Sequence, residues 1–164
     1  MAKVLLNRFK DYVSIDYLAD VMEKNGVSCD RKRNGNVWVK CNQKTFNEFF
    51  DFQKTVYNIF RQYGKRIDRS KIDYDFFDHG GYFTADDGSG VFVFMPYWGE
   101  VNWPGLIAPL WEMGFYAEIC DPDHKHSRPC PIIVRKAKDG DEMFQLTPLM
   151  KMHAESMDFS SYVV

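Results

Sequence analysis

The sequence lacks a long apolar run and a strong charge of either sign. No stretch of the 164 residues approaches the ~20 apolar residues that a membrane-spanning helix needs, and no segment resembles a signal peptide. The formal net charge of −2 argues against a duplex-DNA binder, because such proteins gain affinity by neutralising phosphates. It is also too small for a protein that imitates DNA with a surface of carboxylates. We therefore expect a cytoplasmic protein with no membrane partner, for which nucleic acid is a disfavoured partner.

The sequence also lacks the motifs of several common enzyme classes. It has no P-loop, no G-x-S-x-G nucleophile elbow, no dinucleotide-binding glycine fingerprint and no His-x-Thr pair. With no sign of secretion, the four cysteines are most simply free thiols of a reducing compartment. Because no complete catalytic constellation is present, a non-enzymatic role is favoured.

The composition that is present is that of one globular domain. The chain is 45% hydrophobic and 27% charged, and a domain of this length buries roughly 70% of its unfolded surface. Its 14 Phe, 9 Tyr and 4 Trp are more aromatic residues than a core of this size requires. Some of them are therefore expected to face a partner. We expect a single domain over residues 1–150 and a polar, weakly ordered tail over residues 151–164.

Residues 45–63 are predicted to form a long amphipathic helix around which the core is built. Thr45 is suited to the N-cap, Glu48 follows as in a capping box, and Gly64 is placed to end the helix. The apolar and aromatic residues recur at spacings of three and four, which indicates a helix. They include Phe46, Phe49, Phe50, Val56, Tyr57, Phe60 and Tyr63.

The first part of the chain predicts a short strand, a helix and a hairpin. Residues 14–25 have helical periodicity, and Gly26 is a suitable residue to end the helix. Residues 27–41 are the clearest hairpin, with Asn34-Gly35 at the turn. Keeping the apolar residues on one face pairs Cys29 with Val39 and leaves Gly35 as the left-handed residue of a three-residue turn.

The second part of the chain predicts a hairpin, a short helix and further strands. Residues 14–41 and 104–137 both have the pattern of helix, glycine, strand, loop and strand, which indicates shared supersecondary structure and not a duplication. A hairpin with Asp and Gly in its turn has a return strand that is apolar on both faces, which favours a central position in a sheet. A short helix beginning near Pro104 and ending at Gly114 follows. The remaining predicted strands cover residues 115–120, 131–137 and 142–148. The predicted fold class is α+β, with a mainly antiparallel sheet built from hairpins, the long helix on one face and two shorter helices.

The segment 97–111 contains three tryptophans and two prolines, and it is the preferred candidate for a partner-binding surface. Tyr97, Trp98 and Trp103 are expected to be partly exposed in a Gly- and Pro-containing loop, whereas Trp111 is expected in the core. Tryptophan is over-represented among interface hot spots. The favoured hypothesis is a non-enzymatic intracellular protein-binding module, such as a small modulator or inhibitor of a larger protein, that acts through this aromatic loop.

A metal-dependent enzyme acting on nucleotides or nucleic acid is the first alternative. Two Cys and two His within one loop have the ligand types of a closed zinc site, although their spacing is not that of a common finger. They are Cys120, His124, His126 and Cys130. A magnesium site could instead use Asp73, Asp75 and Asp78, but strand alternation already explains the first two. The simpler hypothesis for the cysteines is burial in strands, and no cofactor is the favoured expectation.

A single-stranded nucleic-acid binder is the second alternative. Two basic groups are interrupted by turns and have aromatic neighbours on which bases could stack. They are Arg31, Lys32 and Arg33 in the hairpin, and Lys65 and Arg66 in a charged linker. A solvated hairpin tip and linker are the preferred explanation for both groups in a protein of negative net charge.

Overall fold

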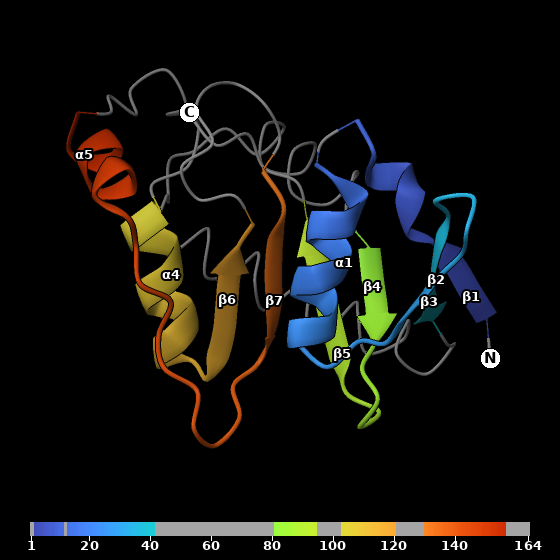
Figure 1. Cartoon of the computed structure of the whole chain (residues 1–164). Coiled ribbons are helices and arrows are strands. Elements are labelled where there is room, and N and C mark those ends of the chain that lie inside the picture. Colours follow the sequence, from blue (N-terminus) through green and yellow to red (C-terminus); the bar gives the residue numbers. More distant parts are fainter. Residues whose placement is uncertain (1, 12, 42–80, 95–102, 121–129, 157–164) are drawn as a thin grey trace, which may run out of the picture.

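The computed structural model describes residues 2–11, 13–41, 81–94, 103–120 and 130–156. In this part of the chain, seven strands form two antiparallel sheets, which three α-helices accompany (Figure 1). The predicted α+β class with antiparallel sheets is confirmed. The predicted long helix over 45–63 lies outside the described residues.

The first sheet is built by one split β-α-β unit. Strand β1 (Ala2–Leu5) leads into a 3₁₀ turn, η1 (Leu6–Phe9), and then to helix α1 (Ile15–Lys24). Strands β2 (Cys29–Arg31) and β3 (Val37–Cys41) follow. The strand order is β1-β3-β2 with both pairings antiparallel, so β1 and β2 run parallel with β3 between them.

Helix α1 begins and ends as its sequence predicts. The side chain of Ser14 accepts a hydrogen bond from the backbone N–H of Tyr17 at the start of the helix. Gly26 follows the C-cap with φ of 89°, and its N–H donates to the carbonyl of Glu23. This left-handed residue ends the helix and turns the chain into β2, because glycine adopts positive φ without a steric cost.

The hairpin of β2 and β3 has the predicted register. Cys29 lies opposite Val39, and the turn is closed where Lys32 N–H donates to Asn36 C=O over 2.8 Å. Gly35 has φ of 91°, as a three-residue turn with a left-handed last residue requires.

The second sheet has four strands in the order β4-β5-β7-β6. They are β4 (Gly81–Thr84), β5 (Gly90–Phe94), β6 (Phe115–Ile119) and β7 (Ile132–Lys136). Helix α4 (Trp103–Glu112) connects β5 to β6. Strand β5 lies between β4 and β7, so the predicted central position of the apolar return strand is confirmed.

The two halves of the chain share one arrangement. In each, a strand leads to a helix, a glycine of positive φ ends the helix, and two antiparallel strands follow. The last strand of each unit, β3 or β7, inserts between the other two. The pattern of helix, glycine and two strands was visible in the sequence, but the common strand order required the structure.

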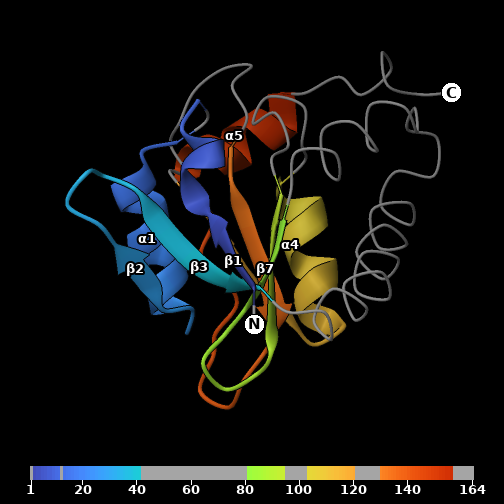
Figure 2. The same cartoon turned by 90° about the vertical axis from the view of Figure 1, so that its right-hand side faces the viewer.

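Two buried clusters lie on opposite faces of the four-stranded sheet. Strand β5 contributes Val91 and Val93 to the cluster on the α1 side and Phe92 to the cluster on the α4 side. Helix α1 also covers the inner face of the three-stranded sheet, where Val37 and Val39 are buried. The four-stranded sheet is therefore a middle layer between α1 and α4, which lie apart in both views (Figures 1 and 2).

The C-terminal part differs from its prediction. Residues 142–147 are not a strand, and helix α5 (Pro148–Ser156) follows them, with Met150 fully buried against α4. The first six residues of the expected tail, 151–156, are thus helical. In the parts of the chain that are described, no helix has the length and apolar character needed to cross a membrane.

Candidate functional site

The predicted partner-binding residue Trp103 is not on an exposed loop. It is the first residue of α4, and its side chain is fully buried in the cluster on the α4 side. Trp111, which was expected in the core, is only partly buried. The helix continues through Pro109 and does not end there. Trp103 is buried together with the other core residues of this helix. Tyr97 and Trp98 lie outside the described residues.

The two cysteines of the predicted zinc site belong to different faces of the sheet. Cys120 is buried in the cluster on the α1 side, and Cys130 is buried in the cluster on the α4 side. The Cys130 thiol donates to the carbonyl of Cys120 over 3.0 Å. His124 and His126 lie outside the described residues, so the zinc site stays a prediction. Among the residues that are described, no group of three or more His, Cys, Asp and Glu is placed to hold a metal ion.

The predicted nucleic-acid-binding residues of the hairpin have different environments. The guanidinium of Arg31 points towards α1 and forms ion pairs of 2.6 to 3.6 Å with Asp16, Asp20 and Glu23. The hydrogen bonds to Asp20 and Glu23 raise the pKa of Arg31, and the three ion pairs join β2 to α1. Lys32 is on the opposite face and binds Asp30 over 3.0 Å, while Arg33 is exposed in the turn.

Most of the other candidate nucleic-acid-binding and metal-binding residues lie outside the described part of the chain. Lys65 and Arg66 lie outside the described residues, as do Asp73, Asp75 and Asp78. Residues 86–89 form the turn between β4 and β5, as their composition predicts. Asp87 accepts hydrogen bonds from Ser89 there, and these bonds, with the ammonium of Lys138, hold its pKa well below the usual range.

A buried polar network joins the end of α1 to β7 and the turn after it. The guanidinium of Arg135, whose side chain is only 9% exposed, binds the carboxylate of Asp141 through two hydrogen bonds. Its Nε donates to the side chain of Asn25 over 3.0 Å, and it lies 4.5 Å from the ring centroid of Tyr116. Every polar edge of the guanidinium is occupied, so this network is a structural clamp.

A second polar group extends the clamp along β6. The Glu118 side chain is 6% exposed and binds the ammonium of Lys24 over 3.1 Å. The hydroxyl of Tyr116 donates to the same carboxylate, and burial followed by this bond raises the pKa of Tyr116. Lys24 and Asn25 thus fix the C-terminal end of α1 against β6 and β7.

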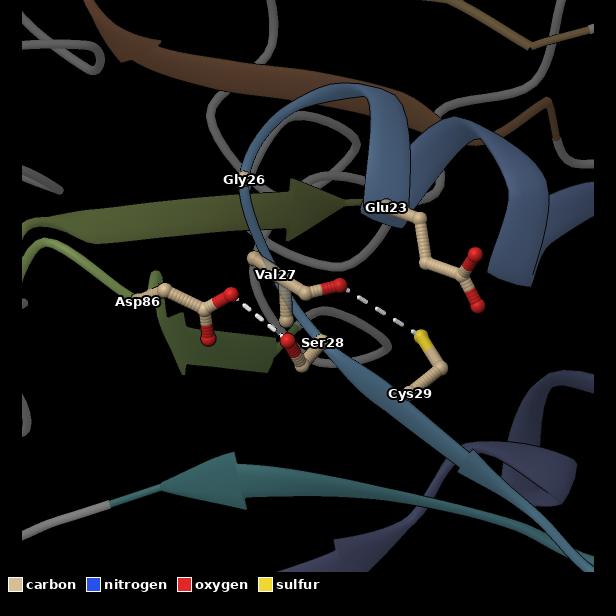
Figure 3. A pocket seen from close by; sticks show the side chains of 6 residues that line it. All are labelled: Glu23, Gly26, Val27, Ser28, Cys29 and Asp86. Carbon is tan, nitrogen blue, oxygen red and sulfur yellow. Dashed lines mark hydrogen bonds between the residues drawn. The ribbon is translucent and has the colours of Figure 1, made fainter.

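A polar hollow of about 330 Å³ lies where α1 leads into β2 (Figure 3). Its lining consists of Glu23, Gly26, Val27, Ser28, Cys29 and Asp86. The hydroxyl of Ser28 donates to Asp86 over 2.6 Å, and the Cys29 thiol donates to the carbonyl of Val27 over 3.7 Å.

The groups in this hollow have low reactivity. Burial, and then the charge of Glu23, raise the pKa of the Cys29 thiol to about 11, so it is protonated at neutral pH. Glu23 is already paired with Arg31, and Asp86 with Ser28. Among the described residues that line the hollow there is therefore neither an activated nucleophile nor an unpaired carboxylate.

The outer face of the three-stranded sheet is different, because no helix in the described part of the chain covers the aromatic side chain at its centre. Val37 and Val39 point inward, so Trp38 between them points to the opposite face, where Leu5 lies directly opposite it on β1. Both side chains are partly exposed, and neither belongs to a buried cluster. In Figure 2, β2 and β3 lie in front of α1, so the view is onto this outer face.

Charged side chains surround Trp38 on this face. Asp30 lies beside Trp38 on β2, and the Lys3–Lys40 pair forms the next row along β1 and β3. Asp30 binds both Lys3, at 3.7 Å, and Lys32, at 3.0 Å. The arrangement has an apolar centre and a charged rim, and we define the outer face as these six residues: Lys3, Leu5, Asp30, Lys32, Trp38 and Lys40.

The sequence pattern around Trp38 also indicates the outer face. In Val-Trp-Val-Lys, the alternation that buries the two valines necessarily exposes Trp38. No comparable sequence pattern indicates the Arg135 network. Asn25 is remote from Arg135 in the sequence, and Asp141 lies at the turn after β7. A comparison with protein-family models, curated proteins and solved structures finds no match for the chain.

Proposed function

We propose that the protein is a non-enzymatic intracellular protein-binding module, a small modulator or inhibitor of a larger protein, and that it binds through the outer face. The observation that carries this proposal is the position of Trp38. It lies on the central strand of the three-stranded sheet, on the face opposite α1, with Leu5 beside it and lysines and an aspartate at its rim. An apolar, aromatic centre with a polar rim is the usual anatomy of a protein interface.

The paired state of three charged side chains, of which Arg135 and Glu118 are buried and Arg31 is exposed, supports binding rather than catalysis. Arg135, Glu118 and Arg31 each bind groups of this chain and connect helix α1 to a sheet. Such pairs hold a surface in a fixed shape, which lowers the entropic cost of binding. A cytoplasmic location fits the same proposal, since the Cys29 thiol donates hydrogen bonds to backbone carbonyls in its reduced form.

The proposal is tested by affinity capture from an extract of the native cell, with quantitative mass spectrometry of the bound proteins. Trp38→Ala should lose the specific partner, because a truncated hot-spot tryptophan commonly costs 2 kcal/mol or more, about thirtyfold in affinity. Met152→Ala is the control, since Met152 is the most exposed of the described large hydrophobic residues at 64% and lies on α5, away from the outer face.

Circular dichroism and urea unfolding of both variants separate a lost contact from a lost fold. A Trp38→Ala protein that is folded and captures the same partners as the wild type contradicts the proposed surface. Equal losses in Trp38→Ala and Met152→Ala would show that the effect is not specific to the outer face.

A further inference from the structure

The outer face has an unusual cross-strand pair of like charges. Lys3 on β1 lies directly opposite Lys40 on β3, an arrangement that destabilises a sheet. The ammonium of Lys3 reaches Asp30, which already binds Lys32, so one carboxylate serves two lysines. Lys40 is exposed and has no ion pair within the described part of the chain. Three lysines and one aspartate thus give the outer face a positive charge on a chain whose net charge is −2.

The positive charge lies beside the apolar centre at a regular distance. Trp38 and Lys40 are two residues apart on β3, so their side chains leave the same face about 7 Å from each other. Leu5 and Lys3 repeat this spacing on β1. An extended partner segment presents every second side chain on one side with the same repeat. It could therefore place an apolar side chain on Trp38 and a carboxylate between Lys3 and Lys40.

We infer that the partner presents an acidic extended segment to the outer face, in which an apolar residue is followed two positions later by Asp or Glu. This inference rests on the proposed function and names the chemistry of its partner. A carboxylate beside Lys3 and Lys40 relieves their mutual repulsion. Within the outer face, Asp30 binds Lys3, but no side chain neutralises the charge of Lys40.

Two other occupants fit the charges less well. A second copy of this chain would bring its own lysines to the same face, and like charges across an interface oppose association. A nucleic acid offers phosphates, but its binders gain affinity by neutralising many of them, and this face has few cations on a chain of negative net charge. An acidic protein segment needs fewer cations and uses the apolar centre.

The inference is tested by selecting a phage-displayed library of random peptides on the full-length protein. Peptides selected by the wild type should be enriched in Asp and Glu two positions from an apolar residue. Lys40→Glu should weaken binding of a selected peptide about fivefold or more, because an attractive rim charge becomes a repulsive one. Lys151→Glu is the matched control, since it makes the same change of charge at an exposed position on α5 and should leave binding unchanged. Rising salt should weaken binding of the wild type.

The outcomes separate this inference from the proposed function. Selected peptides without acidic enrichment, or no selected peptides, overturn the inference. If Trp38→Ala abolishes binding to peptides that are not acidic, the surface stands and the partner chemistry is wrong. If Trp38→Ala selects the same acidic peptides, the surface itself is wrong. Labelled oligothymidylate is the nucleic-acid probe. If the wild type binds this probe, Lys40→Glu removes that binding and no acidic peptide is selected, the outer face is assigned to single-stranded nucleic acid and the inference is overturned.

Discussion

The guanidinium of Arg135 holds the carboxylate of Asp141 in a two-pronged ion pair, with N–O distances of 2.7 and 3.1 Å. Because Nε of the same guanidinium donates to Asn25, one side chain of β7 binds both the turn after it and the C-cap of α1. Arg135 and Asn25 are 110 residues apart in the chain. The end of the helix and the end of strand β7 are thereby fixed to each other.

Replacing Asp141 with alanine should lower the free energy of unfolding by about 3–5 kcal/mol, because it leaves the buried cation of Arg135 without its counter-charge. Urea unfolding followed by circular dichroism measures the change. Asp139→Ala is the control, since Asp139 is exposed in the same turn and its removal should change the free energy by less than about 0.5 kcal/mol. Similar values for the two variants would contradict the clamp.

The same ion pair should make the protein sensitive to acid. The hydrogen bonds from Arg135 hold the pKa of Asp141 below its usual range. A lowered folded-state pKa contributes stability above the unfolded-state pKa, about 3.9, and this stability is lost as the pH falls towards the folded-state value. Asp141→Asn should therefore lose less stability than the wild type between pH 7 and about pH 3, as measured by urea unfolding at each pH. An identical loss in both proteins would show that Asp141 is not responsible.

Local patterns in the sequence predicted the hairpins, whereas the placement of single aromatic residues required the tertiary structure. The register of Cys29 and Val39 follows from keeping apolar residues on one face and from the left-handed Gly35, both of which act over a few residues. Trp103 was expected outside because of its Gly- and Pro-containing neighbourhood. The helix starts at Trp103 itself and turns it into the core, an effect that depends on packing against β6 and β7.

The sequence indicates which side chain of β3 lies on the outer face, but it does not indicate that α1 packs on the other face. The alternation of Val37, Trp38 and Val39 indicates which side chain leaves the core. Only the strand order shows that α1 covers one side of this sheet and not the other. The like-charged pair of Lys3 and Lys40 depends on the register of β1 with β3, which the sequence of a four-residue strand does not determine.

The Cys29 thiol should react slowly with iodoacetamide in the folded protein. Its pKa of about 11, against 9.0 for an ordinary thiol, lowers the thiolate fraction near pH 8 by about 100-fold. A short pulse of the reagent, followed by mass spectrometry of the Cys29 peptide, compares the folded protein with the urea-unfolded chain. Glu23→Gln should accelerate the reaction, because the charge of Glu23 contributes to the raised pKa. Rapid modification of the folded protein at pH 8 would exclude the protonated thiol.

The glycines that end α1 and α4 should be equally sensitive to alanine, because they perform the same turn in the two units. Gly26 and Gly114 have φ of 89° and 88°. A Cβ on Gly114 would meet nothing within 4 Å, and a Cβ on Gly26 would meet the Cβ of Ala85 at an ordinary 3.7 Å. Neither change creates a clash, so the cost comes from the left-handed backbone, about 1–2 kcal/mol in each case.

Asparagine separates backbone strain from every other effect of the added side chain. It tolerates the left-handed region better than alanine, so Gly26→Asn and Gly114→Asn should each cost less free energy of unfolding than the alanine variant at the same position. Urea unfolding of the four variants measures both differences. If alanine is tolerated at Gly114 but not at Gly26, the two helix ends are not equivalent. The shared β-α-β-β arrangement would then stop at strand order and not extend to the residues that build the turn.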